Sequence, residues 1–216
     1  MSVHKEQAGV SVQITKMNKA IFLDRDGVIN YPVLNSKTNE HEAPSNDTDF
    51  KLYSGVIEGL KELQKQKYKL FLVSNQPDYA KGKTTLENLR SVHEEMHSIF
   101  IKNNILFSEY YYCYHHPNGV IPEYSYQCKC RKPENLFLTQ AKIKYDLDFS
   151  KSWMVGDSDI DIFCGQSTGV KTILVKTKES SHRTGKSVPE HVVNNLQEAV
   201  EVIKREHNTG DTYAKH

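Results

Sequence analysis

The sequence of 216 residues contains no long hydrophobic run and almost no excess of either charge. No apolar segment approaches the roughly 20 residues that a membrane-spanning helix needs, and the polar segment 1–19 lacks the apolar region of a signal peptide. These absences predict a cytoplasmic protein without a membrane partner. The formal net charge of +1 gives no uniform field that would attract nucleic acid, so recognition of phosphate must depend on a local site.

The composition is that of a folded protein, with 38% hydrophobic and 25% charged residues. The length fits a single domain that can bury a continuous core, and no internal repeat or low-complexity tract divides the chain. We predict a flexible leader at 1–18, one domain at 19–206 and a flexible tail at 207–216. We expect a monomer.

Short apolar segments alternate along the chain with segments of helical periodicity. The apolar segments predict buried strands at 19–24, 68–73, 107–113, 153–156 and 171–175. The periodic segments predict helices at 54–67, 84–103, 135–145, 160–167 and 195–204. This alternation indicates an α/β fold with a doubly wound parallel sheet. The polar segment 35–49 is expected to form a loop or small flap.

Acidic residues follow two of the predicted strands. Asp24 and Asp26 leave the core two residues apart, and Gly27 allows the chain to turn sharply. One carboxylate can attack phosphorus, while the other protonates the leaving oxygen and later activates water. A magnesium ion bound by the Asp24 side chain, the Asp26 carbonyl and Asp157 would offset their repulsion. Asp161 could hydrogen-bond to this inner shell.

Two further segments can complete such a site. Ser74 and Asn75 end another strand and can donate hydrogen bonds to phosphoryl oxygens, and Lys132 can neutralise charge in the transition state. Each motif alone has a simpler interpretation, because aspartate, serine and asparagine are common in turns and helix caps. Their joint order and their placement at strand ends favour the catalytic interpretation.

These four segments resemble the four motifs of the haloacid dehalogenase (HAD) superfamily of phosphatases, in the order that the superfamily uses. The resemblance covers roughly residues 19–175 and implies a Rossmann-like HAD fold with a minimal cap. It implies Asp24 as nucleophile, Asp26 as general acid and base, Ser74 as phosphate-binding hydroxyl, Lys132 as stabilising lysine and Asp157 as magnesium ligand.

Three of the four cysteines lie close together in the sequence beside histidines. Cys113, His115, Cys128 and Cys130 fit a tetrahedral zinc site that leaves no position open for water. Such a zinc ion would be structural and would staple a loop that carries Arg131 and Lys132 into the active site. His116 competes with His115 as the fourth ligand, and buried free thiols are the alternative to a metal site. Cys164, on a predicted helix, is expected to be a core residue.

The cysteine spacing, with Cys-Lys-Cys-Arg-Lys-Pro at 128–133, is similar to that of the heptose bisphosphate phosphatases and their histidinol-phosphate phosphatase relatives. This resemblance implies that the 7-phosphate of D-glycero-D-manno-heptose 1,7-bisphosphate is removed on the route to nucleotide-activated heptose. We predict that Arg25, Asn75, Lys81 and Arg131 bind the substrate. Lys81 stands where those enzymes have arginine, and Ser158 where they have a lysine next to the metal.

Other functions remain open from the sequence alone. Histidinol phosphate or another small phosphomonoester is the alternative substrate. A catalytically silent, zinc-stapled binding module is the alternative from another class. A polynucleotide 3'-phosphatase would leave the cysteine cluster unexplained, and no surface rich in basic and aromatic residues is concentrated enough for nucleic acid.

Overall fold

The computed structural model describes residues 17–36 and 39–213, so residues 1–16 of the predicted leader lie outside it. Its main feature is a six-stranded sheet in the order β5-β4-β1-β6-β7-β8, in which all neighbouring strands run parallel. The strands are β1 (Lys19–Leu23), β4 (Tyr68–Asn75), β5 (Phe107–Cys113), β6 (Trp153–Gly156), β7 (Lys171–Val175) and β8 (His191–Val193).

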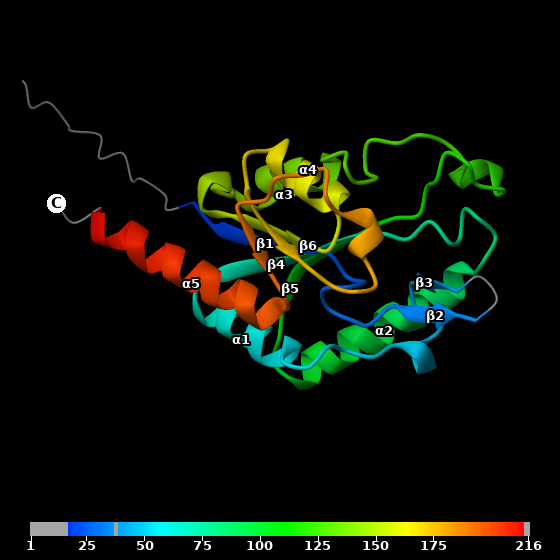
Figure 1. The fold of residues 1–216 in the computed structure, drawn as a ribbon, viewed down its shortest axis with the longest axis horizontal. Helices are drawn as coiled ribbons and strands as arrows, with labels where there is room; N and C mark the ends of the chain where they lie inside the picture. The colour runs from blue at the N-terminus through cyan, green and yellow to red at the C-terminus, as the bar shows by residue number, and fades with distance from the viewer. Residues whose placement is uncertain (1–16, 37–38, 214–216) are drawn as a thin grey trace, which may run out of the picture.

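Helices cover both faces of this sheet (Figure 1). Helices α1 (Val56–Lys65), α2 (Leu86–Lys102) and α5 (Leu196–Tyr213) lie on one face, and α3 (Leu136–Tyr145) and α4 (Asp159–Gln166) lie on the other. Parallel strands need such crossover connections, and the helices bury both faces of the sheet. The prediction of a doubly wound α/β fold is confirmed.

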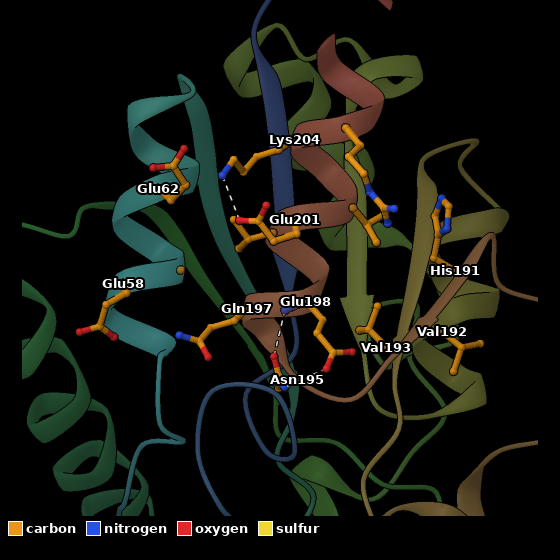
Figure 2. A pocket seen from close by; sticks show the side chains of 14 residues that line it. Glu58, Glu62, His191, Val192, Val193, Asn195, Gln197, Glu198, Glu201 and Lys204 are labelled. Atoms are coloured by element: carbon orange, nitrogen blue, oxygen red, sulfur yellow. Dashed lines mark hydrogen bonds and ion pairs between the residues drawn. The ribbon is translucent and has the colours of Figure 1, made fainter. Parts of the chain in front are cut away.

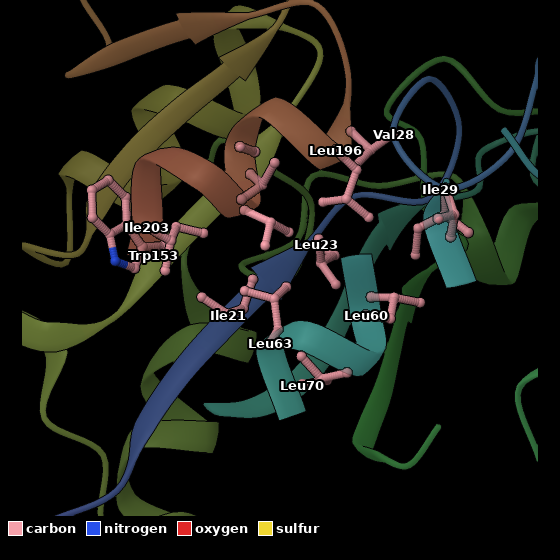
Figure 3. Packing of buried hydrophobic residues seen from close by; sticks show 14 of the residues in the cluster. Ile21, Leu23, Val28, Ile29, Leu60, Leu63, Leu70, Trp153, Leu196 and Ile203 are labelled. Atoms are coloured by element: carbon pink, nitrogen blue, oxygen red, sulfur yellow. The ribbon is translucent and has the colours of Figure 1, made fainter. Parts of the chain in front are cut away.

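The neighbouring strands β1 and β4 show why the sheet has a core on each side. Ile21 and Leu23 of β1 pack in the core under α1 and α5 (Figure 3), whereas Phe22 faces α3 and α4. Successive side chains of a strand point to opposite faces, so an uninterrupted apolar segment supplies both cores. In β4, Phe71 follows the same rule and stacks on Phe22 with ring centroids 5.1 Å apart.

The predicted flap contains a small antiparallel hairpin outside the main sheet, formed by β2 (Val33–Asn35) and β3 (Glu40–Glu42). A short 3-10 helix, η1 (Asp47–Asp49), follows and contacts α2. An ion pair between Glu42 and Lys83 connects the hairpin to the segment after β4. The cap of this fold is therefore a hairpin rather than a second domain.

The structured region extends further at both ends than the sequence indicated. Helix α5 continues to Tyr213, which corrects the predicted tail at 207–216 as far as that residue. His207 Nε2 lies 3.0 Å from Lys19 Nζ, so this part of the helix is docked against β1. At the other end, the amide of Asn18 donates to the Asp146 carbonyl at 2.9 Å, which places it within the fold.

Two further differences concern short elements. Strand β8 was not predicted, and the 3-10 helices η2 (Pro122–Tyr124), η3 (Phe149–Lys151) and η4 (Ser181–Arg183) lie in connections. Within the described part of the chain, no helix has both the length and the apolar character that crossing a membrane requires.

Candidate active site and metal centre

The predicted catalytic residues meet at the carboxyl edge of the sheet, around its central strands. Asp24 directly follows β1, Ser74 and Asn75 end β4, and Asp157 directly follows β6. β1 pairs with β4 on one side and β6 on the other, so these three strand ends are neighbours. Ligands of doubly wound sheets bind at this edge, where the strand order reverses.

Three carboxyl groups form a compact cluster there. One oxygen each of Asp24, Asp157 and Asp161 lies within 4.8 Å of the others, and all three residues are buried. Asp161 was expected only as an outer partner, but it lies within this cluster. It is held at the start of α4, where its Oδ2 accepts hydrogen bonds from the amide and hydroxyl of Ser158 in a capping box.

A glycine brings the Asp24–Asp26 turn against this cluster. Gly27 has a φ of +91°, and a Cβ atom at this residue would lie 2.1 Å from Asp157 Oδ2. Any other residue would have both a strained backbone and a clash with the carboxylate. Gly27 therefore makes the close approach of the two strand ends possible.

Lys132 is the buried cation of the cluster. Its Nζ lies 2.8 Å from Asp24 Oδ1 and 2.6 Å from Asp161 Oδ1, and it donates to the Val73 carbonyl at 2.6 Å. Burial opposes the charged form of Lys132, but the carboxylates of Asp161 and Asp24 outweigh this effect and raise its pKa above the ordinary value. Lys132 is thus a permanent positive charge.

Asn75 holds the main chain of Lys132 in place. Its Oδ1 accepts from the Lys132 amide at 3.0 Å, and its Nδ2 donates to the Lys132 carbonyl at 3.1 Å. These bonds join Asn75 to the loop that carries the lysine, and the contact of Asn75 with substrate stays a prediction.

The charged forms of these carboxyl groups are unfavourable when no metal ion is bound. Burial raises the pKa of Asp24 to about 6, although Lys132 opposes the shift, and burial also raises the pKa of Asp157 well above its ordinary value. Among the described residues, none hydrogen-bonds to the buried Asp157 Oδ1. A magnesium ion binds oxygen ligands, and Asp157 Oδ1 is an oxygen without another partner in the described part of the chain. The residues present therefore fit this cation.

Asp26 lies in a neighbouring polar network. Arg25 Nη2 donates to Asp26 Oδ2 at 3.1 Å and to Gln76 Oε1 at 2.9 Å, and it is 1% exposed. Gln76 Nε2 donates to Asp26 Oδ2 at 2.6 Å and to the buried Ser74 hydroxyl at 2.9 Å. Asn30 also donates to Asp26, at 2.9 Å. In this arrangement Arg25 orients Asp26, and its binding of substrate stays a prediction.

Gln76 and Arg183 were not identified from the sequence. Gln76 follows the two polar residues at the end of β4, and this proximity was its only signal. Arg183, in η4, places Nη2 2.7 Å from Asp157 Oδ2. It lies 26 positions away in a segment without a motif, so nothing in the pattern pointed to it.

The second cluster contains the four predicted zinc ligands. The sulfur atoms of Cys113, Cys128 and Cys130 lie 3.2–3.5 Å apart, and His115 Nδ1 lies 3.4 Å from Cys130 Sγ and 3.7 Å from Cys113 Sγ. Zinc–sulfur bonds of about 2.3 Å would place the ligands of a tetrahedral site about 3.8 Å apart. Burial raises the pKa of Cys113, and a bound cation would offset this effect. The donor set therefore fits zinc.

Hydrogen bonds distinguish the two adjacent histidines. His115 Nε2 lies 2.7 Å from Tyr126 Oη, which leaves Nδ1 directed at the sulfur atoms. His116 Nδ1 instead accepts from the amide of Asn118 at 3.1 Å, and it is not part of the cluster. The structure therefore brings His115, rather than His116, to the three thiols.

The remaining predicted residues lie around this loop. Arg131 Nη1 donates to the His115 carbonyl at 3.3 Å. The pKa of His116 is lowered by burial and by the positive charges of Lys81 and Arg131, which places both cations on this side of the site. Cys164 is buried away from the cluster and donates to the Glu134 carbonyl at 3.3 Å, as expected of a core residue.

A large groove lies elsewhere on the molecule. It has a volume of about 980 Å³ and is formed by α1, α5 and β8, with several acidic side chains including Glu58, Glu62, Glu198 and Glu201 (Figure 2). It contains none of the predicted site residues. The clustered carboxyl groups and their buried lysine, and not the size of a cavity, therefore identify the candidate active site.

Comparisons with known proteins agree with this geometry. Residues 129–199 match the family described as HAD-hydrolase-like. The D-glycero-β-D-manno-heptose-1,7-bisphosphate 7-phosphatase of Vibrio cholerae is 34% identical over 187 residues, which cover 86% of this chain and 96% of the relative. The enzyme of the same name from Haemophilus influenzae is 35% identical over 190 residues, which cover 88% and 98%.

A solved structure shares the fold. The D,D-heptose 1,7-bisphosphate phosphatase of B. bronchiseptica, crystallised with magnesium and phosphate, superposes with a TM-score of 0.72 at 24% identity, covering 87% of this chain and 99% of that one. The extent and identity of the sequence matches establish that this chain belongs to the D-glycero-β-D-manno-heptose-1,7-bisphosphate 7-phosphatase family of HAD hydrolases.

Proposed function

We propose that this chain is a magnesium-dependent phosphatase that removes the 7-phosphate of D-glycero-D-manno-heptose 1,7-bisphosphate through an aspartyl-phosphate on Asp24. The observation that carries the proposal is the buried cluster of Asp24, Asp157 and Asp161 around Lys132 at the sheet edge. The family's relatives are named for this activity, which supports the choice of substrate.

In the first step, Asp24 attacks phosphorus and the bond between phosphorus and the sugar oxygen breaks. Lys132 binds Asp24 Oδ1, so Oδ2 is the oxygen available for attack. Asp26 gives a proton to the leaving sugar oxygen. Lys132 offsets negative charge that builds up beside Asp24.

In the second step, Asp26 takes a proton from water while the water oxygen attacks phosphorus. The bond between phosphorus and Asp24 breaks, which releases phosphate and restores the carboxylate. Arg25, Asn30 and Gln76 all donate to Asp26, so they hold its carboxyl group in place for the proton transfers. The Ser74 hydroxyl, which Gln76 orients, would bind a phosphoryl oxygen.

The side chains of Asp24 and Asp157 and the carbonyl of Asp26 would hold the magnesium ion. When bound, the ion would offset the charge of the carboxylates and of the phosphoryl group. The unpaired Asp157 Oδ1 and the raised pKa values of Asp24 and Asp157 support this assignment.

Cys113, His115, Cys128 and Cys130 would hold a structural zinc ion. Cys130 precedes Lys132 by two residues, so this site would fix the loop that carries Arg131 and Lys132. Lys81 and Arg131, which lie on the same side of the site, would bind the distal phosphate. A monomer that acts on this small substrate, without a nucleic-acid partner, remains our prediction.

The test is phosphate release from a panel of substrates by purified protein with magnesium. The panel contains both anomers of heptose 1,7-bisphosphate, histidinol phosphate and a simple sugar monophosphate, and Asp24→Asn serves as the inactive control. We expect the heptose bisphosphate to give the highest kcat/KM. Faster release from histidinol phosphate would overturn the substrate assignment, and no release from any ester would favour a silent binding module.

A further inference from the structure

The hydrogen bonds of Lys132 leave the active site short of a donor for substrate. An ammonium group has three N–H donors. Those of Lys132 face Asp24 Oδ1, Asp161 Oδ1 and the Val73 carbonyl, each at 2.6–2.8 Å. Lys132 therefore contributes charge, and its ammonium group is buried among these three protein oxygens.

The neighbouring Arg25 cannot fill this role either. Its side chain is 1% exposed, and its Nε and Nη2 donate to Asp26 and Gln76. The residue after Asp157 is Ser158, which is uncharged and bonded to Asp161. A phosphoryl group that approaches Asp24 would need a cation with free N–H groups from another element.

Arg183 has the required position and free donors. Its Nη2 lies 2.7 Å from Asp157 Oδ2, and its side chain is 44% exposed. A guanidinium has five N–H donors in a planar fork, and among the described residues the Arg183 side chain donates to Asp157 alone. Asp157 thus holds Arg183 with Oδ2, while its unpaired Oδ1 remains available to a metal ion.

The loop that carries Arg183 is fixed without substrate. Asp159 accepts hydrogen bonds from the amides of Gly185, Lys186 and Ser187 at 2.9–3.2 Å and from the Ser187 hydroxyl at 2.6 Å. Within η4, the amide of Arg183 donates to the carbonyl of the buried Ser180 at 2.8 Å. The guanidinium is therefore pre-positioned at the rim of the site.

We propose that Arg183 binds oxygens of the reacting phosphoryl group, oriented by Asp157, and that it supplies exposed N–H donors, which the buried Lys132 and Arg25 do not. This inference rests on the proposed function, because it assumes that the carboxylate cluster binds a phosphoryl group. It adds a substrate-binding residue from the connection between β7 and β8, outside the four motifs.

The experiment measures binding of inorganic phosphate to the full chain by calorimetry in saturating magnesium chloride. Arg183→Gln removes the charge, Arg183→Lys keeps the charge but not the fork, and Lys178→Gln removes an exposed charge from the same loop. We expect Arg183→Gln to raise the Kd for phosphate roughly tenfold or more, Arg183→Lys to give an intermediate value and Lys178→Gln to match the wild type. Zinc content and thermal unfolding verify that each variant is folded.

A magnesium titration without phosphate provides the second readout. We expect Arg183→Gln to bind magnesium at least as tightly as the wild type, because Asp157 loses a competing cation. An unchanged Kd for phosphate in Arg183→Gln would overturn the inference, and so would a wild type that binds no phosphate. If the wild type binds phosphate through Arg183 but hydrolyses no ester, the proposed function fails while the role of Arg183 in anion binding stands.

Discussion

The side-chain amide of Asn75 bridges the amide and carbonyl of Lys132, with hydrogen bonds of 3.0 and 3.1 Å. These two bonds join the end of β4 to the loop that follows the cysteine cluster. The position of the buried cation beside Asp24 therefore depends on a residue whose side-chain hydrogen bonds go to the Lys132 main chain and not to Asp24 or Asp161.

Removal of this bridge is expected to lower turnover. Asn75→Ala leaves the Lys132 main chain without its two partners, and a displacement of about 1 Å in an active site can reduce a rate about 100-fold. We predict a loss of kcat of that order, measured by phosphate release, with unchanged zinc content. Asn88→Ala, an exposed position on α2, is the matched control. A kcat equal to that of the wild type would show that Lys132 does not need this support.

Replacement of the nucleophile is expected to abolish turnover and to alter the pH dependence of stability. The pKa of Asp24 is raised from 3.8 to about 6, so the folded protein binds this proton more tightly than the unfolded chain does. Its contribution to the free energy of unfolding therefore falls as pH rises from about 4 to about 6, and stays low above that range. Asparagine does not titrate, so Asp24→Asn lacks this contribution to the pH dependence of the free energy of unfolding.

The measurement is thermal unfolding of the magnesium-free, zinc-loaded protein between pH 4 and 7.5. We predict that Asp24→Asn has a higher Tm than the wild type at pH 7.5 and that the difference shrinks toward pH 4. Magnesium should then raise the Tm of the wild type more than that of the variant. A lower Tm for Asp24→Asn at pH 7.5 would contradict the predicted cost of the buried charge.

Loss of one thiol from the cysteine cluster is expected to remove the metal and stability together. Cys128→Ser should contain no zinc and should lose several kcal/mol, a fall in Tm of roughly 10 °C for a chain of this length. Cys164→Ser is the control, because that thiol projects from α4 into the core and its hydroxyl replacement can still donate to the Glu134 carbonyl. Normal zinc content in Cys128→Ser would refute the proposed ligand set.

The two adjacent histidines should behave differently. His115→Ala removes the nitrogen that lies 3.4 Å from Cys130 Sγ, so we predict a zinc content well below one per chain. His116→Ala affects only the hydrogen bond with Asn118 and should retain zinc. Metal analysis of both purified variants decides the point, and the reverse result would assign the fourth ligand to His116.

A methyl group at Gly27 should disrupt the carboxylate cluster. Gly27→Ala places Cβ 2.1 Å from Asp157 Oδ2, so Asp157 must move and the affinity for magnesium should fall with activity. Gly169→Ala is the control for backbone strain, because its φ is +79° but nothing lies within 4 Å of the new Cβ. The control should lose about 1–2 kcal/mol of stability and keep its activity. Equal effects of the two substitutions would mean that strain, not the clash, is responsible.

The sequence predicts most of the sheet and the residues at its strand ends, because short apolar segments followed by aspartate leave a clear pattern. It predicts the cysteine cluster for a similar reason, since ligand spacing is local. The burial of Arg25 leaves no such pattern. Arg25 is enclosed where its turn meets Gln76, and the hydrogen bond between Asp26 and Gln76 joins residues 50 positions apart in the sequence. Arg183 meets Asp157 in a region where Asp159 holds the segment directly after Arg183, and no periodicity records these contacts.

Short and polar elements also escaped prediction. Strand β8 has three residues, and its Val192 is 57% exposed, so it shows neither an apolar segment nor a clear alternation. The end of α5 is polar, and its extent depends on contacts such as that of His207 with Lys19, on the other end of the chain. Tertiary contacts rather than local propensity define both elements.

The separation of Cys130 and Lys132 by a single residue has a practical consequence for any preparation of this protein. Molecules without the proposed zinc ion would also have an unanchored ammonium group beside Asp24. A partly demetallated sample would then be a mixture of competent and incompetent molecules rather than a uniformly slower enzyme. Titration of the phosphorylated fraction in a single turnover should therefore equal the measured stoichiometry of zinc.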